Sequence, residues 1–232
     1  MQGNQKSRVA GKFEHPLVVC VDVGSIRRRR FAWACDDGEV SDSDSKCIKA
    51  LVDCLKATLS AGRSVALGFE APLSFPDHDE PLLLGKARTE DGARPWSAGA
   101  GATVLPTALA QLRWILRELR KTLENERVPI PVTFTASDLR SPKPVLMIWE
   151  AMVTGDAKRG KKTERTDDAD AHFYDARCAA NAFARSLSTG DLPPPELKRV
   201  SLAGMLVDAL KLPGQPDLVW IGPPIVKPPD RA

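Results

Sequence analysis

Three acids in this chain have the side-chain type and the placement that metal-dependent chemistry requires. Asp22 ends the apolar run LVVCVD, and Glu70 ends the apolar run SVALGFE. Both runs have the composition of buried strands, and in α/β sheets the C-terminal ends of strands tend to carry the functional site. Asp175 lies in a later segment with a helical pattern. We expect these three carboxylates to converge.

Converging carboxylates repel one another unless a cation neutralises them. Mg²⁺ and Mn²⁺ are hard cations that take oxygen ligands. Two such ions about 3.5–4 Å apart activate a water and stabilise the leaving oxygen of a phosphodiester. The expected chemistry is therefore phosphodiester hydrolysis with Mg²⁺ or Mn²⁺ as the cofactor. In it, Asp22 bridges the ions, and Glu70 and Asp175 complete the ligand set.

Other interpretations of the single acids stay open. Asp22 in VDVG also fits a turn. Asp175 also fits a solvated helix position, and Asp168 and His172 share its helix face. For His172, an exposed position is favoured over a ligand or a general base. Glu150, near the end of the apolar run KPVLMIWEA, fits a catalytic acid and a structural acid equally well.

Two basic segments carry the cations expected to hold nucleic-acid phosphates. The first follows the first strand and consists of Arg27, Arg28, Arg29 and Arg30. The second, KRGKKTER, precedes the acidic helix and contains Lys158, Arg159, Lys161, Lys162 and Arg165. A solvated charge run is the alternative for each segment. The expected partner is nucleic acid, with DNA and RNA both open.

The overall composition bounds these expectations. The chain has 232 residues, of which 43% are hydrophobic, enough for the core of one large domain. Its net charge of +3 excludes a polybasic coat, so contacts with nucleic acid must be local. The five cysteines form no CxxC pair, and no apolar run approaches the roughly 18 residues that span a bilayer. We expect a reduced, cytoplasmic protein with no membrane partner.

The apolar pattern predicts an α/β fold in which helices flank a mixed sheet. The expected strands are at 17–23, 31–35, 64–72, 131–137, 143–151 and 217–222, and the expected helices are at 47–59, 107–126, 167–187 and 201–212. The first two strands form a hairpin with the arginine run at its tip. Residues 73–106 show no periodicity, so this segment is either functional or contains an element that the pattern misses.

Four short motifs lie at the expected strand ends and in the acidic helix: VDVG (21–24), FEAP (69–72), IWEA (148–151) and YDARCAANA (174–182). Together they resemble a bacterial domain-of-unknown-function family of predicted ribonuclease H-like nucleases, over most of residues 17–187. The resemblance implies a ribonuclease H-like single domain that hydrolyses nucleic acid by a two-metal mechanism. It implies Asp22, Glu70 and Asp175 as catalytic metal ligands. Glu150 is implied as a further catalytic acid. The arginine-rich first hairpin departs from the family's pattern and leaves the substrate open, and Glu70 stands where an aspartate is commoner.

We expect the chain to divide into three parts. Residues 1–16 are a flexible N-terminal segment, 17–190 the ribonuclease H-like domain, and 191–232 a Pro-rich extension that packs on the domain and offers a surface to a protein partner. A non-catalytic scaffold that binds nucleic acid or protein fits the same fold. A third interpretation ranks lower: VDVGS resembles the first phosphate loop of actin-like ATP-binding proteins, but no second D-x-G strand is visible.

Overall fold

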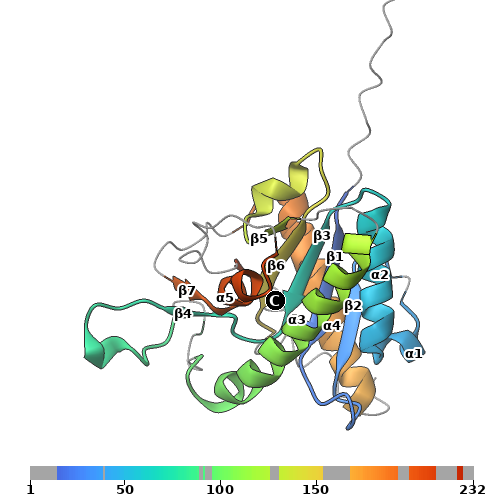
Figure 1. The fold of residues 1–232 in the computed structure, drawn as a ribbon. Coiled ribbons are helices and arrows are strands. Elements are labelled where there is room, and N and C mark those ends of the chain that lie inside the picture. The colour runs from blue at the N-terminus through green and yellow to red at the C-terminus, as the bar shows by residue number, and fades with distance from the viewer. Residues whose placement is uncertain are drawn as a thin grey trace, which may run out of the picture.

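The computed structural model describes residues 15–38, 40–88, 91, 96–125, 131–153, 168–192, 199–212 and 224–226. Within them a mixed sheet is flanked by helices, which confirms the α/β class predicted from the sequence (Figure 1). None of the described helices combines the length and the apolar character that crossing a membrane requires. All five cysteines lie in described segments and are free thiols.

The main sheet has the strand order β2, β1, β3, β6, β5, and β8 pairs with the end of β6. The strands are β1 (Leu17–Asp22), β2 (Ala32–Cys35), β3 (Val65–Phe69), β5 (Val132–Thr133), β6 (Leu146–Ala151) and β8 (Ile225–Val226). β2 runs antiparallel to β1, whereas every other pairing in this sheet is parallel. β1 and β2 thus form the predicted hairpin, and the arginine turn lies at the C-terminal end of β1.

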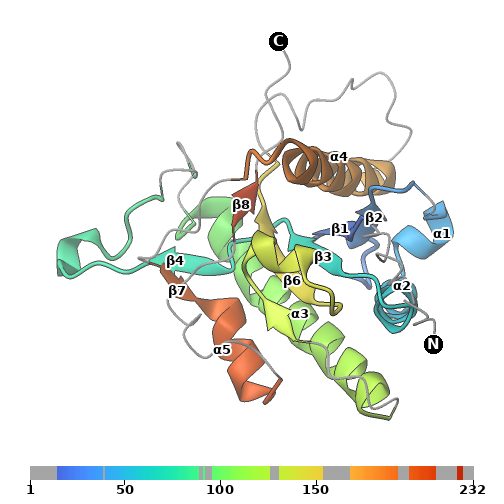
Figure 2. The ribbon, with the colours of Figure 1, turned by 90° about the horizontal axis from the view of Figure 1, so that it is seen from above.

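Helices cover both faces of the sheet (Figure 2). α2 (Ile48–Ser60) and α3 (Gly99–Asn125) lie on one face, and α4 (Asp168–Thr189) lies on the other, against β1 and β2. α5 (Leu202–Ala209) packs beside α3. The central strands are buried on both sides, which explains why they form continuous apolar runs in the sequence.

Alternation along β1 divides the core in two and sets the direction of Asp22. Val19 and Val21 belong to the cluster formed with α2 and α3, whereas Cys20 belongs to the cluster formed with α4. Successive side chains of a strand point to opposite faces, so Asp22 points to the α4 side. The same alternation at the end of β3 directs Glu70 to the α4 side, because the odd-numbered positions of β3 join the first cluster.

Gly68 in β3 allows a large aromatic side chain of the neighbouring strand to lie across it. A Cβ atom on Gly68 would lie 2.2 Å from the indole ring of Trp149 in β6. Trp149 stacks on Phe183 of α4, with the ring centroids 4.3 Å apart. Both aromatic side chains are fully buried. This stack therefore seats α4 on the sheet, with the face that carries Asp175 at a fixed height above the strands.

The segment without periodicity, 73–106, contains elements that its composition conceals. β4 (Ser74–Pro76) pairs antiparallel with β7 (Arg199–Ser201) in a second, two-stranded sheet. α3 begins at Gly99 and includes Pro106, so it starts well before the predicted helix. Proline lacks the N–H that an interior helix position donates, and for this reason the sequence pattern predicts a helix start only after Pro106.

Smaller differences concern short elements and the tail. Short helical segments form where the sequence predicts none: α1 (Asp42–Ser45), η1 (Pro81–Leu83) and η3 (Ala136–Arg140). The strand predicted at 131–137 is reduced to the two residues of β5, and η3 begins within its last two residues. The strand predicted at 217–222 and most of the N-terminal segment lie outside the described residues. The division at residues 16 and 190 stays a prediction.

Candidate metal centre

Asp22, Glu70 and Asp175 come together at the C-terminal ends of β1 and β3. Each offers one carboxylate oxygen, and these oxygens lie within 4.8 Å of one another. Asp22 ends β1, and Glu70 directly follows β3, where its N–H donates to the carbonyl of Val21 (2.8 Å). Asp175 comes from α4, which covers this side of the sheet. The three side chains thus converge as expected, and their metal-binding and catalytic roles stay predictions.

The donor set fits a hard divalent cation. Mg²⁺ takes oxygen ligands at about 2.0–2.1 Å, so two ligands of one ion lie at most about 4.2 Å apart. Oxygens that lie within 4.8 Å of one another need only small side-chain rotations to reach that span. Asp22 and Asp175 are buried, whereas Glu70 is half-buried. Oε2 of Glu70 is itself buried, and the side chain lines the pocket beside Asp22.

The charge of the three acids acts on the thiol beneath them. Burial raises the pKa of Cys20 well above its ordinary value. The charges of Glu70, Asp22 and Asp175 raise this pKa further. Cys20 lies two residues before Asp22 on the same face of β1. A local field that disfavours one more negative charge is one that a cation would relieve.

His172 also joins this group, a contact that the sequence interpretation does not favour. Its Nδ1 atom lies 2.6 Å from Oδ2 of Asp22. Because an ionised carboxylate only accepts hydrogen bonds, Nδ1 donates in this contact. His172 precedes Asp175 by one turn of α4, and this spacing is the signal in the sequence that could have identified it. The side chain of Asp168 lies outside the described part of the chain.

Glu150 does not join the group of three because it has the opposite phase in its strand. In the register of the parallel strands, Val21, Phe69 and Glu150 are neighbours. Val21 and Phe69 belong to the core on the side of α2 and α3. Ala151 has the phase that faces α4. A shift of one residue moves a strand side chain to the other face, so Glu150 points away from the candidate metal centre.

Arg88, which the sequence analysis did not identify, neutralises Glu150. Its Nη1 donates to Oε2 of Glu150 (2.6 Å), and its Nη2 donates to Oδ1 of Asp91 (2.8 Å). The N–H of Leu73 and the hydroxyl of Ser74 donate to Oε1 of Glu150. Burial raises the pKa of Glu150, and the charge of Arg88 opposes this rise. The ion pair is buried, so it fastens the segment after β4 to β6.

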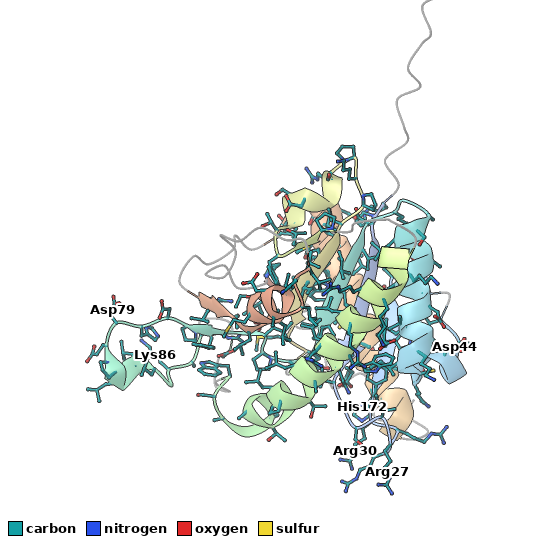
Figure 3. All side chains as sticks on the ribbon, in the orientation of Figure 1. Arg27, Arg30, Asp44, Asp79, Lys86 and His172 are labelled. Atoms are coloured by element: carbon teal, nitrogen blue, oxygen red, sulfur yellow. The ribbon has the colours of Figure 1, made fainter. Side chains whose placement is uncertain are left out.

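The arginine run lies at an exposed turn near the candidate metal centre. All four residues, Arg27, Arg28, Arg29 and Arg30, are exposed. Figure 3 places Arg27 and Arg30 at the same end of the molecule as His172. The other predicted phosphate-binding residues lie outside the described part of the chain: Lys158, Arg159, Lys161 and Lys162. Only the first basic segment is therefore located relative to the acids.

Two contacts fix the base of this turn. Nε2 of Gln111 in α3 donates to the carbonyl of Gly24 (2.7 Å). A Cβ atom on Gly24 would lie 1.9 Å from the carbonyl oxygen of Arg30, so only glycine lets the two ends of the turn meet. Arg29 has a φ of 57°, in the left-handed region that favours glycine. The turn is thus a tightly closed structure anchored to α3.

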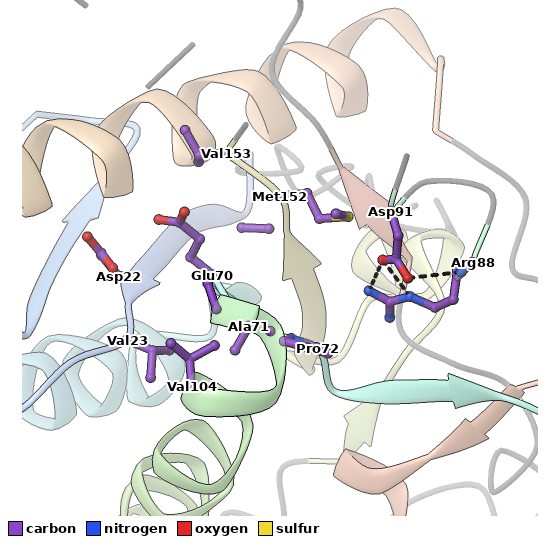
Figure 4. Close-up of a pocket in the computed structure, with 13 residues that line it drawn as sticks. Asp22, Val23, Glu70, Ala71, Pro72, Arg88, Asp91, Val104, Met152 and Val153 are labelled. Atoms are coloured by element: carbon purple, nitrogen blue, oxygen red, sulfur yellow. Dashed lines mark hydrogen bonds and ion pairs between the residues drawn. The ribbon is translucent and has the colours of Figure 1, made fainter. Parts of the chain in front are cut away.

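A pocket of about 150 Å³ opens beside Asp22 and Glu70 (Figure 4). It passes the ends of β3 and β6 and reaches the first turns of α3. Its apolar walls include Ala71, Pro72, Gly101, Val104, Ala151 and Met152. Arg88 and Asp91 lie at the end of the pocket that is remote from Asp22. Asp22 and Glu70 therefore stand at one end of a pocket, and most of its apolar residues line it further along.

Comparisons of the chain with protein-family models, with curated proteins and with solved structures found no match. The chemistry of the site is therefore inferred from its own residues, and the resemblance to ribonuclease H-like nucleases stays a prediction.

Proposed function

We propose that this protein is a divalent-metal-dependent nuclease with a ribonuclease H-like fold. The observation that carries the proposal is the convergence of Asp22, Glu70 and Asp175, whose carboxylate oxygens lie within 4.8 Å of one another. These acids come from two strand ends and a helix, and each lies in one of the motifs that resemble this class of nuclease. A mixed sheet with a parallel centre and an antiparallel first hairpin is compatible with that fold.

Each residue of the group has a defined task in this proposal. Asp22, Glu70 and Asp175 would hold the metal ions through their carboxylate oxygens. His172 orients Asp22 by donating a hydrogen bond to its carboxylate. When bound, Mg²⁺ or Mn²⁺ supplies an activated water and stabilises the leaving oxygen of a phosphodiester. The half-buried Glu70 leaves the side of the site that faces the pocket accessible to substrate.

The arginine turn provides the phosphate contacts of the proposed nuclease. Arg27 to Arg30 add four positive charges at the end of the molecule where the acids converge. Arginine binds phosphate through a planar, bidentate set of N–H donors. The arginines would hold the phosphates next to the one that lies at the three acids. Lys158, Arg159, Lys161 and Lys162 extend this role in the proposal, because their segment directly precedes α4.

Calorimetric titration of the purified protein with Mn²⁺ tests the metal centre. We expect the wild-type protein to bind one or two ions and Asp22→Ala to lose this binding. Asp53→Ala is the matched control, because Asp53 is an exposed acid on α2. Wild-type protein that binds no Mn²⁺ would contradict the proposal.

Cleavage assays test the reaction itself. We expect DNA or RNA to be cleaved with Mg²⁺ or Mn²⁺ and to remain intact with EDTA. The triple variant in which Asp22, Glu70 and Asp175 are replaced by alanine should lose this cleavage. Metal-dependent cleavage by this variant would contradict the proposal. Nucleic-acid binding that does not change on metal removal, without any cleavage, would instead indicate a non-catalytic scaffold.

A further inference from the structure

The pocket beside the acids differs in character from the candidate metal centre. Asp22 and Glu70 stand at one end, and its walls are mainly small or aliphatic side chains from the strand ends and from α3. Ala71 and Ala151 contribute only methyl groups, and Gly101 contributes no side chain. An apolar pocket with a few polar groups is typical of a site that binds an organic group. Hydrated ions alone do not require such walls.

The size of the pocket limits what it holds. Its volume is about 150 Å³, whereas pockets for drug-sized ligands begin at about 300 Å³. An apolar cavity of about 150 Å³ engineered in another protein takes up benzene. The pocket therefore accommodates one planar ring system, and a whole nucleotide or a base pair exceeds its volume.

The walls of the pocket are held by packed contacts. A Cβ atom on Gly101 would lie 2.8 Å from the carbonyl oxygen of Trp96, so the first turn of α3 packs closely on Trp96. Trp96 stacks on Phe75, with ring centroids 5.5 Å apart. At the far end, Arg88 and Asp91 are buried and bonded to each other. These contacts give the pocket a defined shape and a polar end.

From these features we propose that the pocket binds one unpaired nucleobase of the nucleic acid whose phosphate lies at Asp22, Glu70 and Asp175. This inference rests on the proposed nuclease function and adds the substrate class. In this proposal the apolar walls contact the flat sides of the ring, and the bonded pair of Arg88 and Asp91 closes the far end of the pocket. A base inside a duplex must first leave the stack, which costs a few kcal/mol and costs least where the base is already unpaired. The substrates are therefore single strands, strand ends or unpaired nucleotides.

Binding of a mononucleotide to the full chain tests the pocket without requiring cleavage. The probes are deoxyadenosine 5′-monophosphate and deoxyribose 5-phosphate, each titrated calorimetrically with Mn²⁺ present and with EDTA. They share the phosphate and the sugar, and a hydroxyl replaces the base at C1′ of the sugar phosphate, so the ratio of their affinities reports on the pocket. We expect the nucleotide to bind at least tenfold more tightly than the sugar phosphate. Equal affinities in the wild-type protein would overturn the inference.

Variants that fill the pocket locate this binding. Val104→Trp fills it from α3, and Met152→Trp fills it from the end of β6. Each should abolish the preference for the nucleotide and leave the Mn²⁺ affinity within about twofold. Ala102→Trp is the matched control, since Ala102 is exposed on the same turn of α3. A preference that survives in both filled variants, with the folded state verified by circular dichroism, would also overturn the inference.

Failure of this inference is distinguishable from failure of the proposed function. If the protein binds Mn²⁺ but shows no preference for the nucleotide, the nucleobase inference is contradicted and the proposed metal centre is still supported. If the protein binds no Mn²⁺ but prefers the nucleotide, and Val104→Trp abolishes this preference, the proposed metal-dependent nuclease is contradicted and the nucleobase pocket is supported.

Discussion

Nδ1 of His172 lies 2.6 Å from Oδ2 of Asp22, across a separation of 150 positions in the chain. This hydrogen bond joins α4 to the end of β1 beside the other two acids. Partners of this kind orient metal-ligating side chains and tune their affinity. The contact therefore makes His172 a positioning residue for Asp22 in the proposed nuclease.

Replacement of His172 by alanine is expected to weaken Mn²⁺ binding about 10- to 100-fold, the range found when outer partners of metal ligands are removed. The comparison is calorimetric titration of His172→Ala and Asn181→Ala, the latter an exposed position on the same helix. Chemical denaturation in EDTA should show that both variants remain folded, with a lower unfolding free energy for His172→Ala, which loses a hydrogen bond to a buried carboxylate. An unchanged Mn²⁺ affinity in His172→Ala would show that the hydrogen bond has no role in metal binding.

Replacement of Asp175 by asparagine is expected to stabilise the metal-free protein by about 0.5–2 kcal/mol, the range of a typical stabilising substitution. Asparagine keeps the shape of the side chain and removes one of three converging negative charges. The same variant should lose the rise in Tm that Mn²⁺ produces in the wild-type protein. Thermal unfolding in EDTA and in Mn²⁺ measures both effects, and a lower Tm in EDTA would argue against repulsion among the acids.

The double variant Arg27→Ala/Arg30→Ala is expected to bind nucleic acid less tightly and with a weaker dependence on salt. Each lost phosphate contact lowers the slope of log K against log salt by about 0.7–0.9, so the double variant should lose up to about 1.8. Binding isotherms at several salt concentrations give the slope. Lys49→Ala/Arg185→Ala removes two exposed cations from α2 and α4 and serves as the control. Identical slopes for the two double variants would exclude the turn as the phosphate-binding element.

Replacement of Arg88 by alanine is expected to destabilise the fold by about 3–5 kcal/mol, because it leaves Glu150 and Asp91 buried without their cation. Urea denaturation measures the loss. Arg117→Ala, which removes a partly exposed ion pair on α3, should change the unfolding free energy little.

The decrease in unfolding free energy caused by Arg88→Ala should also depend on pH. Burial raises the pKa of Glu150 and the charge of Arg88 opposes this rise, so the pKa of Glu150 rises further in Arg88→Ala. The contribution of this group to stability is greatest below its ordinary pKa and is lost as the pH rises through the raised pKa. The deficit of Arg88→Ala should therefore shrink as the pH falls toward about 4. A deficit independent of pH would mean that Glu150 does not titrate in this range.

The strands and helices that position the acids could be predicted because their signals are local. β1 and β3 are continuous apolar runs, and α4 has an apolar stripe of helical period. The convergence of Asp22 and Glu70 follows from parallel pairing, which brings the C-terminal ends of β1 and β3 to one edge. The sequence signal of each of these three elements lies within its own segment of the chain.

Other features depend on contacts that no local pattern contains. Glu150 looks equivalent to Glu70 in the sequence, but only the register of β6 against β3 shows that it has the opposite phase. The role of Arg88 follows only from its ion pair with Glu150, which lies 62 positions away in the chain. The early turns of α3 cannot be predicted from the sequence because they contain glycines and Pro106, which disfavour a helix. Packing of these turns against the core stabilises the helix despite these residues.

Because α4 follows β1 and β3 in the chain, it is the last part of the candidate metal centre to leave the ribosome. Until then, Cys20 and Trp149 lack the cover that Ala179, Ala180 and Phe183 of α4 give them, and a nascent chain exposes much of that apolar face to chaperones and to aggregation. Docking of α4 covers this face and delivers Asp175 and His172 in the same step. Long-range closure of this kind slows folding, and it keeps the proposed nuclease from forming before its core is complete.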